Sequence, residues 1–269
     1  MTDMSSTALL LAAHGERRAG ATNDRAMRVA AALAARGIAD EVGVAFIKGT
    51  PSIGKAIRAF AARRIIVYPL FLSEGYFIRV RLAQALDLAW RKDRRRVFHV
   101  LPPLGLDPGF ADLVAEQVAA AQPPGSMLSA VNLILVAHGS TTNPGSRIAT
   151  QRVAAGIRAR SLFRSVRCAF LDEPPSLREA SWNLPPPLTI VGLFAGDGRH
   201  ASLDLPRLIA KLHRVVVFAG TMASLDGVDD LVAAAVARLS DHERQRMSPE
   251  TPSAALRQRR TAPLNSLPW

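Results

Sequence analysis

The chain has 269 residues, with 34 Lys and Arg against 22 Asp and Glu, a formal net charge of +12 and a single cysteine. This length suits one large domain or two small ones, and either can bury a core without covalent staples. The lone Cys168 excludes a disulfide within the chain and a site built from several thiolates, so we expect a cytoplasmic protein.

Membrane and nucleic-acid partners are disfavoured by the same numbers. The first apolar run, residues 8–13, is far shorter than the roughly 20 residues of a spanning helix, and no basic segment precedes it. Aromatic residues make up 6% of the chain and do not interleave with the basic clusters, as they do in single-stranded nucleic-acid binders. Coding bias is one source of so many arginines; a small, multiply anionic substrate is another reason for them.

The first half of the chain alternates short apolar runs with amphipathic segments. The expected strands cover 8–13, 41–46, 65–71 and 96–101, and the expected helices cover 21–35, 52–63, 80–91 and 110–121. Strands that alternate with helices predict right-handed crossovers and a mostly parallel sheet covered on both faces. In such sheets ligands bind beyond the carboxyl ends of the strands.

The same pattern recurs later in the chain. The run that ends in His14-Gly15 returns as a run that ends in His138-Gly139, an offset of 138 − 14 = 124 residues. Ala45-Phe46 and Pro51-Ser52 return at this offset, and Leu70-Phe71 returns as Leu193-Phe194 one residue out of register. We therefore interpret the chain as a duplicated unit.

The expected organisation follows from this repeat. Residues 1–122 form the first half, 131–239 form the second, and the Pro- and Gly-containing stretch 123–130 is a linker. Residues 240–269 are rich in Arg, Pro and Ser without periodicity, and we expect them to be disordered.

Two histidines end the first strand of each half. The glycine after each lets the backbone turn tightly and would place His14 and His138 at the sheet edge. A hydrogen-bonded structural histidine is the alternative at either position. Packing of the halves about a two-fold axis would bring both imidazoles to one cleft.

Further polar side chains follow later strands of the second half. His200 comes after a glycine-rich turn, and it would face His138, with Asp204 near the start of the next helix, where the helix dipole alone could explain an acid. Asp172 and Glu173 follow the second strand and could accept a proton or help to bind a cation. Capping of the helix that begins near Ser176 is the alternative, particularly for Glu173. Imidazole ligands suit Co²⁺, Ni²⁺ and Fe²⁺.

These segments together resemble the CbiX/SirB family of class II chelatases, which insert Co²⁺, Ni²⁺ or Fe²⁺ into sirohydrochlorin. The resemblance rests on His138-Gly-Ser, on Phe170-Leu-Asp with its Pro-Ser, and on Leu193-Phe with Gly-Arg-His200 and Asp204-Leu-Pro. It covers about residues 8–238 and is stronger in the second half. It implies an α/β fold of two chelatase-like, flavodoxin-like halves with a cleft between them, each half holding a parallel sheet of about four strands flanked by helices.

The resemblance also implies roles for individual residues. His138 and His200 correspond to the family's metal-binding histidines, His14 is the matching histidine of the first half, and Asp172 stands where the family has an acid. His138, His200 and Asp172 are thus the expected catalytic residues. The spacing from Asp172 to the following proline is shorter than in the family.

The first half departs from the family pattern. Phe77 stands where the second half has His200, and Lys48 where it has Asp172. We expect the first half to have lost half of a metal site and to shape the macrocycle pocket instead. The residues expected to bind the substrate are Tyr76, Phe77, Arg79, Arg81, Ser140 and Arg199.

Metal insertion explains why these residue types are useful. The tetrapyrrole loses two pyrrole protons while the cation exchanges water for ring nitrogens, and histidine can act both as base and as ligand near neutral pH. Two or three imidazoles with open positions can release the metal, whereas a closed tetrahedral site would retain it. The expected partner is a tetrapyrrole bearing carboxylate arms, which the positive field would steer. We expect no tightly bound cofactor, the divalent metal being a substrate, and a monomer whose halves imitate a dimer.

Two alternatives remain. A non-catalytic tetrapyrrole- or metal-binding protein is compatible with the altered first half. A phosphoryl hydrolase with a histidine nucleophile would need arginines beside that histidine to hold the phosphoryl group, and Ala13 and Ala137 stand there instead.

Overall fold

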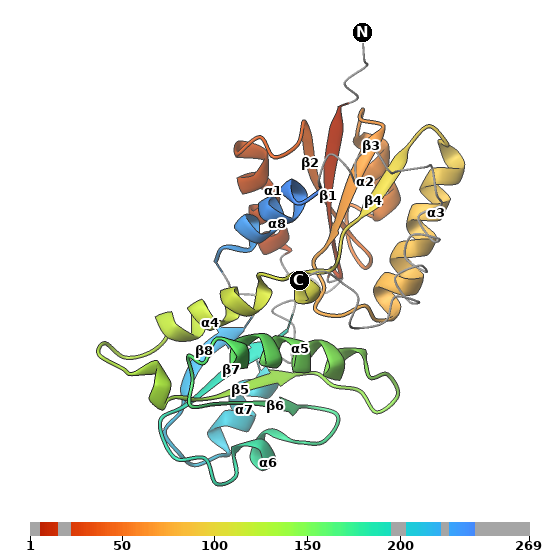
Figure 1. Cartoon of the computed structure of the whole chain (residues 1–269). Helices are drawn as coiled ribbons and strands as arrows, with labels where there is room; N and C mark the ends of the chain where they lie inside the picture. Colours follow the sequence, from red (N-terminus) through yellow and green to blue (C-terminus); the bar gives the residue numbers. More distant parts are fainter. Residues whose placement is uncertain (1–5, 16–22, 195–202, 222–225, 240–269) are drawn as a thin grey trace. The chain divides into compact units, whose positions relative to one another are not determined.

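The computed structural model describes residues 6–15, 23–194, 203–221 and 226–239. These residues divide into two compact units, one from the chain up to Asp107 together with the segment from Val228, and one from Pro108 to Gly227. Each unit is built around a four-stranded sheet (Figure 1). The predicted class, two parallel sheets flanked by helices, is confirmed. The predicted C-terminal tail, 240–269, lies outside the described residues.

The first unit holds a parallel sheet with the strand order β2-β1-β3-β4. Its elements are β1 (Thr7–Ala13), α1 (Asp24–Ala35), β2 (Glu41–Phe46), α2 (Ile53–Ala59), β3 (Arg64–Pro69), the π-helical turn η1 (Phe77–Leu82), α3 (Ala83–Lys92), β4 (Val97–Val100), the 3₁₀ turn η2 (Leu104–Leu106) and α8 (Val228–Ala237).

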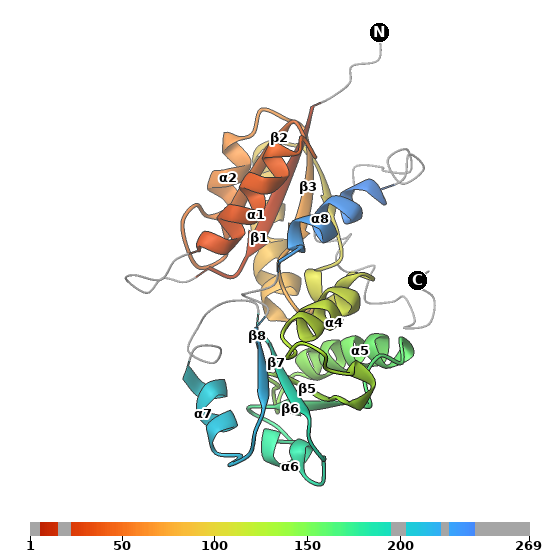
Figure 2. The ribbon, with the colours of Figure 1, turned by 90° about the vertical axis from the view of Figure 1, so that its left-hand side faces the viewer.

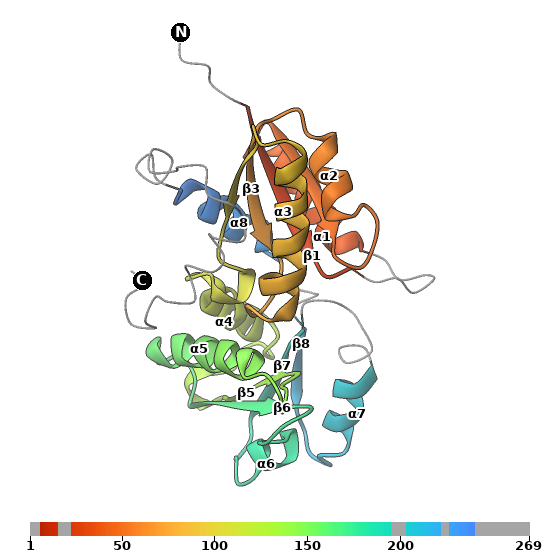
Figure 3. The same ribbon diagram turned by 90° about the vertical axis from the view of Figure 1, so that its right-hand side faces the viewer.

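Both faces of this sheet are covered, as the continuous apolar sequence of β1 requires. Alternate residues of β1 point to opposite faces. Leu10 packs with α2 and α3 in one core cluster that includes Ile57 and Leu86, and these two helices lie side by side (Figure 3). Leu9 and Leu11 point to the other face, where α1 and α8 lie together (Figure 2).

The second unit repeats this arrangement with the strand order β6-β5-β7-β8, also parallel. Its elements are α4 (Phe110–Ala120), the 3₁₀ turn η3 (Leu128–Ala130), β5 (Asn132–Ala137), α5 (Gly145–Ala159), β6 (Ser165–Phe170), α6 (Leu177–Ser181), β7 (Leu188–Leu193), α7 (Leu205–Ala210) and β8 (Val217–Thr221). All residues of β5 are buried. The helices α6 and α7 cover one face, and α4 and α5 lie together on the other (Figure 2).

The last helix of each half of the sequence packs on the sheet of the other half. Although α4 follows β4 along the chain, it packs beside α5, and α8, which follows β8, packs beside α1. An equivalent ion pair stands at both contacts. Arg160, directly after α5, binds Asp112 of α4. Arg36, directly after α1, lies 2.7 Å from Asp230 of α8. The arginines are again 160 − 36 = 124 residues apart. The compact units therefore differ from the halves 1–122 and 131–239, and the predicted linker 123–130 lies within the second unit.

The helix predicted at 52–63 ends earlier, at Ala59. The carboxylate of Glu41 accepts the backbone N–H groups of Ala61 and Ala62, at 3.1 and 2.7 Å, and Arg96 donates to the carbonyls of Ile57 and Phe60. These contacts replace the bonds of a further helical turn. None of the described helices combines the length and the hydrophobicity that a membrane-spanning segment needs.

Replacing Gly156 by leucine tests the packing of α4 on α5. A Cβ at Gly156 would stand 2.8 Å from the Cβ of Ala111 on α4, so a larger side chain overpacks this contact. We expect the Gly156→Leu variant to lose about 1–3 kcal/mol of unfolding free energy in urea titrations. Ala155→Leu, on the exposed side of the same helix, should change stability by less than about 0.5 kcal/mol. Equal effects of the two substitutions would contradict this packing.

His99 on β4 should make the fold sensitive to acid. His99 is 6% exposed. Burial, with a smaller contribution from the charge of Arg64, lowers the pKa of its imidazole from 6.5 to about 4. Between pH 6.5 and 4 this histidine binds a proton in the unfolded chain but stays neutral in the folded one, so the free energy of unfolding falls as the pH falls. We expect urea titrations to show a loss of about 2 kcal/mol between pH 6.5 and 4.5. The His99→Phe variant should lose less over this range, and parallel pH profiles would contradict the assignment.

Candidate metal and tetrapyrrole site

Two matching turns end the central strands of the two sheets. His14-Gly15 follows β1 and His138-Gly139 follows β5, and both glycines have φ +75°. A Cβ at Gly15 would lie 2.6 Å from the carbonyl oxygen of Lys48, and one at Gly139 would lie 2.7 Å from Cγ of Glu173. The backbone conformation and the space therefore both require glycine, as the sequence predicted.

Each histidine accepts a backbone hydrogen bond from the loop after the neighbouring strand. The donor stands two residues after the end of β2 in the first half and two residues after the end of β6 in the second. The N–H of Lys48 donates to the carbonyl of His14 at 2.7 Å, and that of Asp172 donates to the carbonyl of His138 at 3.0 Å. The predicted correspondence of Lys48 and Asp172 is confirmed. The two halves therefore hold opposite charges at the same place beside their histidines.

In the second unit the histidine is paired with the carboxylate. Nδ1 of His138 lies 3.0 Å from Oδ2 of Asp172 and 3.2 Å from the carbonyl oxygen of Gly139. The two side chains are 46% and 53% exposed, so the pair is open to a ligand. A carboxylate on one ring nitrogen of a histidine orients the ring and selects the tautomer whose other nitrogen can bind a metal.

The buried carboxylate of Glu173 holds the His138-Gly139 turn in place. The Glu173 side chain is 6% exposed and its Oε2 pairs with Arg147 of α5, while its Oε1 accepts the N–H of Ser140 at 3.1 Å. The guanidinium of Arg147 also lies 5.3 Å from the centre of the Phe170 ring. Glu173 thus ties the residue after His138-Gly139 to the helix that follows it.

The sequence had left capping as an alternative role for Glu173, and that alternative is wrong. Ser176 caps α6 itself: its hydroxyl accepts from the N–H of Glu179, whose carboxylate accepts from the N–H of Ser176. This capping box satisfies the helix end and leaves Glu173 to the turn. The role of Arg147 was missed, because only an acid 26 residues away identifies it. Spacing along the chain carries no signal of that contact.

Ser140 organises the loop rather than pointing free into solvent. Its hydroxyl oxygen accepts from the N–H groups of Thr142 and Asn143, at 3.3 and 3.1 Å, and Gly139 N–H donates to the Ser146 hydroxyl at 3.2 Å. The predicted contact of Ser140 with substrate stays a prediction.

The first unit surrounds its histidine with different chemistry. The His14 ring meets Phe77 edge to face, with the centroids 4.4 Å apart, and the Lys48 ammonium lies 5.0 Å from the centre of the Phe77 ring. Tyr76 contacts the same ring at 5.7 Å and is 56% exposed. An aromatic ring and a cation beside His14 favour an anionic, partly apolar ligand over a dication.

The remaining predicted residues are placed as follows. Arg79 lies 3.5 Å from Glu74 in an ion pair, and Arg81 is exposed on η1. His200 and Arg199 lie outside the described residues. Within the described ranges no three His, Cys, Asp or Glu side chains are close enough together to hold a metal. His14 and His138 belong to different units, so their convergence with His200 stays a prediction.

Comparison with known proteins bears on both halves. The CbiX family model matches residues 8–121 and again residues 132–242. The chain belongs to the CbiX family. The two matches agree closely with the halves found in the sequence, and CbiX membership confirms the resemblance on which the site residues were chosen.

Relatives and solved structures agree with this assignment. A Halobacterium salinarum protein named "Probable sirohydrochlorin cobaltochelatase" is 26% identical over 219 residues, 74% of this chain and 75% of its own. A structure described as CbiX, the terminal enzyme for siroheme biosynthesis in denitrifying bacteria, matches with a TM-score of 0.67 and 26% identity over 89% of this chain and 99% of its own. The multi-domain protein DR2241 of Deinococcus radiodurans matches with a TM-score of 0.74 and 25% identity over 87% of this chain. The present chain spans only 55% of the length of that Deinococcus protein.

Replacing Glu173 by glutamine tests its support of the His138 turn. The change keeps the size of the side chain but leaves Arg147 without its anion, so we expect a loss of about 1–3 kcal/mol of unfolding free energy in urea. Glu116→Gln, an exposed change of the same kind on α4, should cost less than about 0.5 kcal/mol. Equal stability of Glu173→Gln and the parent would show that the buried pair does not hold the turn.

Proposed function

We propose that this chain is a chelatase, a lyase that inserts a divalent transition metal into sirohydrochlorin or a related tetrapyrrole. Membership of the CbiX family over both halves supports the reaction. The name of the Halobacterium relative makes Co²⁺ the first candidate, with Fe²⁺ and Ni²⁺ as alternatives. The observation that carries the proposal is the exposed pair of His138 and Asp172 at the carboxyl edge of a sheet.

His138 has the chemistry that the reaction needs. Its imidazole is a suitable ligand for Co²⁺, Ni²⁺ or Fe²⁺ and also a base that can take a pyrrole proton. Asp172 holds the ring by Nδ1, 3.0 Å away, which leaves Nε2 to bind the metal or to accept that proton. We assign His200 the role of second ligand and base, which lets two open-sided imidazoles bind and then release the metal.

The first half binds the macrocycle in this proposal. The Lys48 ammonium near His14 opposes a dication there, so His14 contributes less to metal binding than His138 does. Phe77 and Tyr76 offer aromatic surface to the ring. Carboxylate arms of the tetrapyrrole pair with cations, for which Arg79, Arg81 and Arg199 are the candidates. Ser140 stays a candidate for a hydrogen bond to an arm.

The remaining assignments complete the proposal. The metal is a substrate rather than a resident cofactor, and no tightly bound cofactor takes part. The chain works as a monomer in the cytoplasm, with its two related halves in the place of two subunits.

The test is anaerobic incubation with sirohydrochlorin and Co²⁺, Fe²⁺ or Ni²⁺, followed by absorbance. We expect metal insertion with at least one cation, and about a hundredfold lower rates for His138→Ala and His200→Ala because each loses a base and ligand. Asp172→Asn should lower the rate less, and His14→Ala least.

The control for these variants is His213→Asn. His213 is exposed after α7 and has φ 48°, a conformation that asparagine tolerates. It should keep the parental rate. Binding of sirohydrochlorin without insertion of any of the three metals would favour the non-catalytic binding protein instead, and full activity of His138→Ala would overturn the site.

A further inference from the structure

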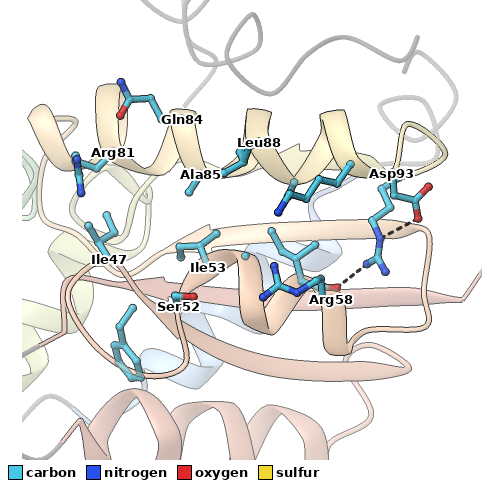
Figure 4. A pocket seen from close by; sticks show the side chains of 15 residues that line it. Ile47, Ser52, Ile53, Arg58, Arg81, Gln84, Ala85, Leu88 and Asp93 are labelled. Carbon is cyan, nitrogen blue, oxygen red and sulfur yellow. Dashed lines mark hydrogen bonds and ion pairs between the residues drawn. The ribbon is translucent and has the colours of Figure 1, made fainter.

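A groove of about 660 Å³ lies between α2 and α3 of the first unit (Figure 4). We call it the α2–α3 groove. Its lining is largely apolar, and Leu88, a large hydrophobic side chain on α3, is 57% exposed there. The apolar side chains of the lining are Phe46, Ile47, Ile53, Ile57, Ala85, Leu88 and Ala89. Pockets of this size and lining are typical of sites for small molecules.

Four cations line the same groove, Arg96 and three exposed ones. Arg58 comes from α2, Arg81 from η1 and Lys92 from α3, and all three are exposed. Across the described parts of the chain, none of the three side chains takes part in an ion pair or a hydrogen bond. The Arg58 side chain folds back along its own helix, with Nη1 3.5 Å from the position of a Cβ at Gly54, another lining residue. Figure 4 shows Arg58 and Arg81 in the groove from opposite helices.

The one acid of the lining does not cancel these charges. Asp93 lies 3.0 Å from Arg95 and 3.4 Å from Arg96, and its hydrogen bond with Arg95 lowers the pKa of its carboxyl group. Arg96 in turn donates to the carbonyls of Ile57 and Phe60. This end of the groove is therefore closed by satisfied groups, and the positive charge of the rest is left for a ligand.

The other end of the groove reaches the edge of the sheet that carries the first histidine. Ile47, part of the lining, donates its N–H to the carbonyl of Ala13 at 3.0 Å, one residue before His14. Ile47 and Phe77, the neighbour of His14, pack against the same core cluster. A ligand in the groove would therefore lie beside the macrocycle-binding side of the first unit.

We propose that the α2–α3 groove binds a small polycarboxylate with an apolar body. The body lies on Ile53, Leu88 and their neighbours, and carboxylates pair with Arg58 and Lys92, the two exposed groove cations that the proposed function does not use. That this ligand is a carboxylate-bearing tetrapyrrole rests on the proposed function. The groove is then a second place for the macrocycle on the chain, which holds it before or after metal insertion.

The experiment compares two double variants that remove the same charge. Arg58→Glu with Lys92→Glu changes the groove, and Lys55→Glu with Arg91→Glu changes exposed positions of the same two helices outside its lining. The probe is uroporphyrin, a macrocycle with eight carboxylates, titrated into the full-length chain by calorimetry. We expect two macrocycles per chain for the parent and the control variant, and one for the groove variant.

Two results would overturn the inference. One macrocycle per chain for the parent removes the second site, and equal loss in both double variants assigns the effect to the overall positive field. Circular dichroism checks folding, and Arg58→Gln with Lys92→Gln replaces the groove variant if the glutamates unfold it. Metal insertion is measured separately. A chain that inserts no metal but loses one uroporphyrin in the groove variant would leave this inference intact and contradict the proposed function.

Discussion

The constraint on which the rest of the structure depends is the tight turn at the carboxyl end of each buried central strand. The strands β1 and β5 lie inside their sheets with helices on either side, so the chain must leave at the carboxyl edge within a residue or two. Gly15 and Gly139 make that possible with φ +75° in space where no Cβ fits. The residue before each glycine is thereby fixed at the sheet edge, and in both units it is histidine. Position in the fold, more than the local sequence, makes these two imidazoles available for chemistry.

The two halves show how one backbone arrangement supports different chemistry. The backbone N–H that binds back to the histidine carbonyl is the same in both, but it belongs to Lys48 in one half and to Asp172 in the other. Behind it, Gly49 of the first half corresponds to the buried Glu173 of the second. The second half therefore combines an anion beside its histidine with a braced turn, and the first combines a cation with aromatic rings. This division suits the proposed roles, in which the second half binds the metal and the first binds the macrocycle.

Much of the architecture could be predicted from the sequence because the pattern was local. Buried strands appear as apolar runs, and the Gly after each histidine marks the end of a strand, so the strand order along the chain and the equivalence of Lys48 and Asp172 were confirmed. What escaped prediction depends on contacts between distant residues. Glu41, on the preceding strand, ends α2 early. Glu173, in the loop after β6, pairs with Arg147 of α5. Nothing in the amphipathic pattern of α4 says which of two similar sheets it will cover.

The exchange of α4 and α8 has a consequence for the history of this chain. Half of the sequence on its own would contain a sheet whose own last helix packs elsewhere, which leaves an apolar face without its cover. Two copies of such a half cover both sheets when each places its last helix on the sheet of the other. Here α4 lies beside α5 and pairs with Arg160, and α8 lies beside α1 and pairs with Arg36. The matched pairs of Arg160 with Asp112 and of Arg36 with Asp230 are those that two identical copies of one half would form. A duplicated gene that kept them could then diverge at its two histidine turns without losing either core.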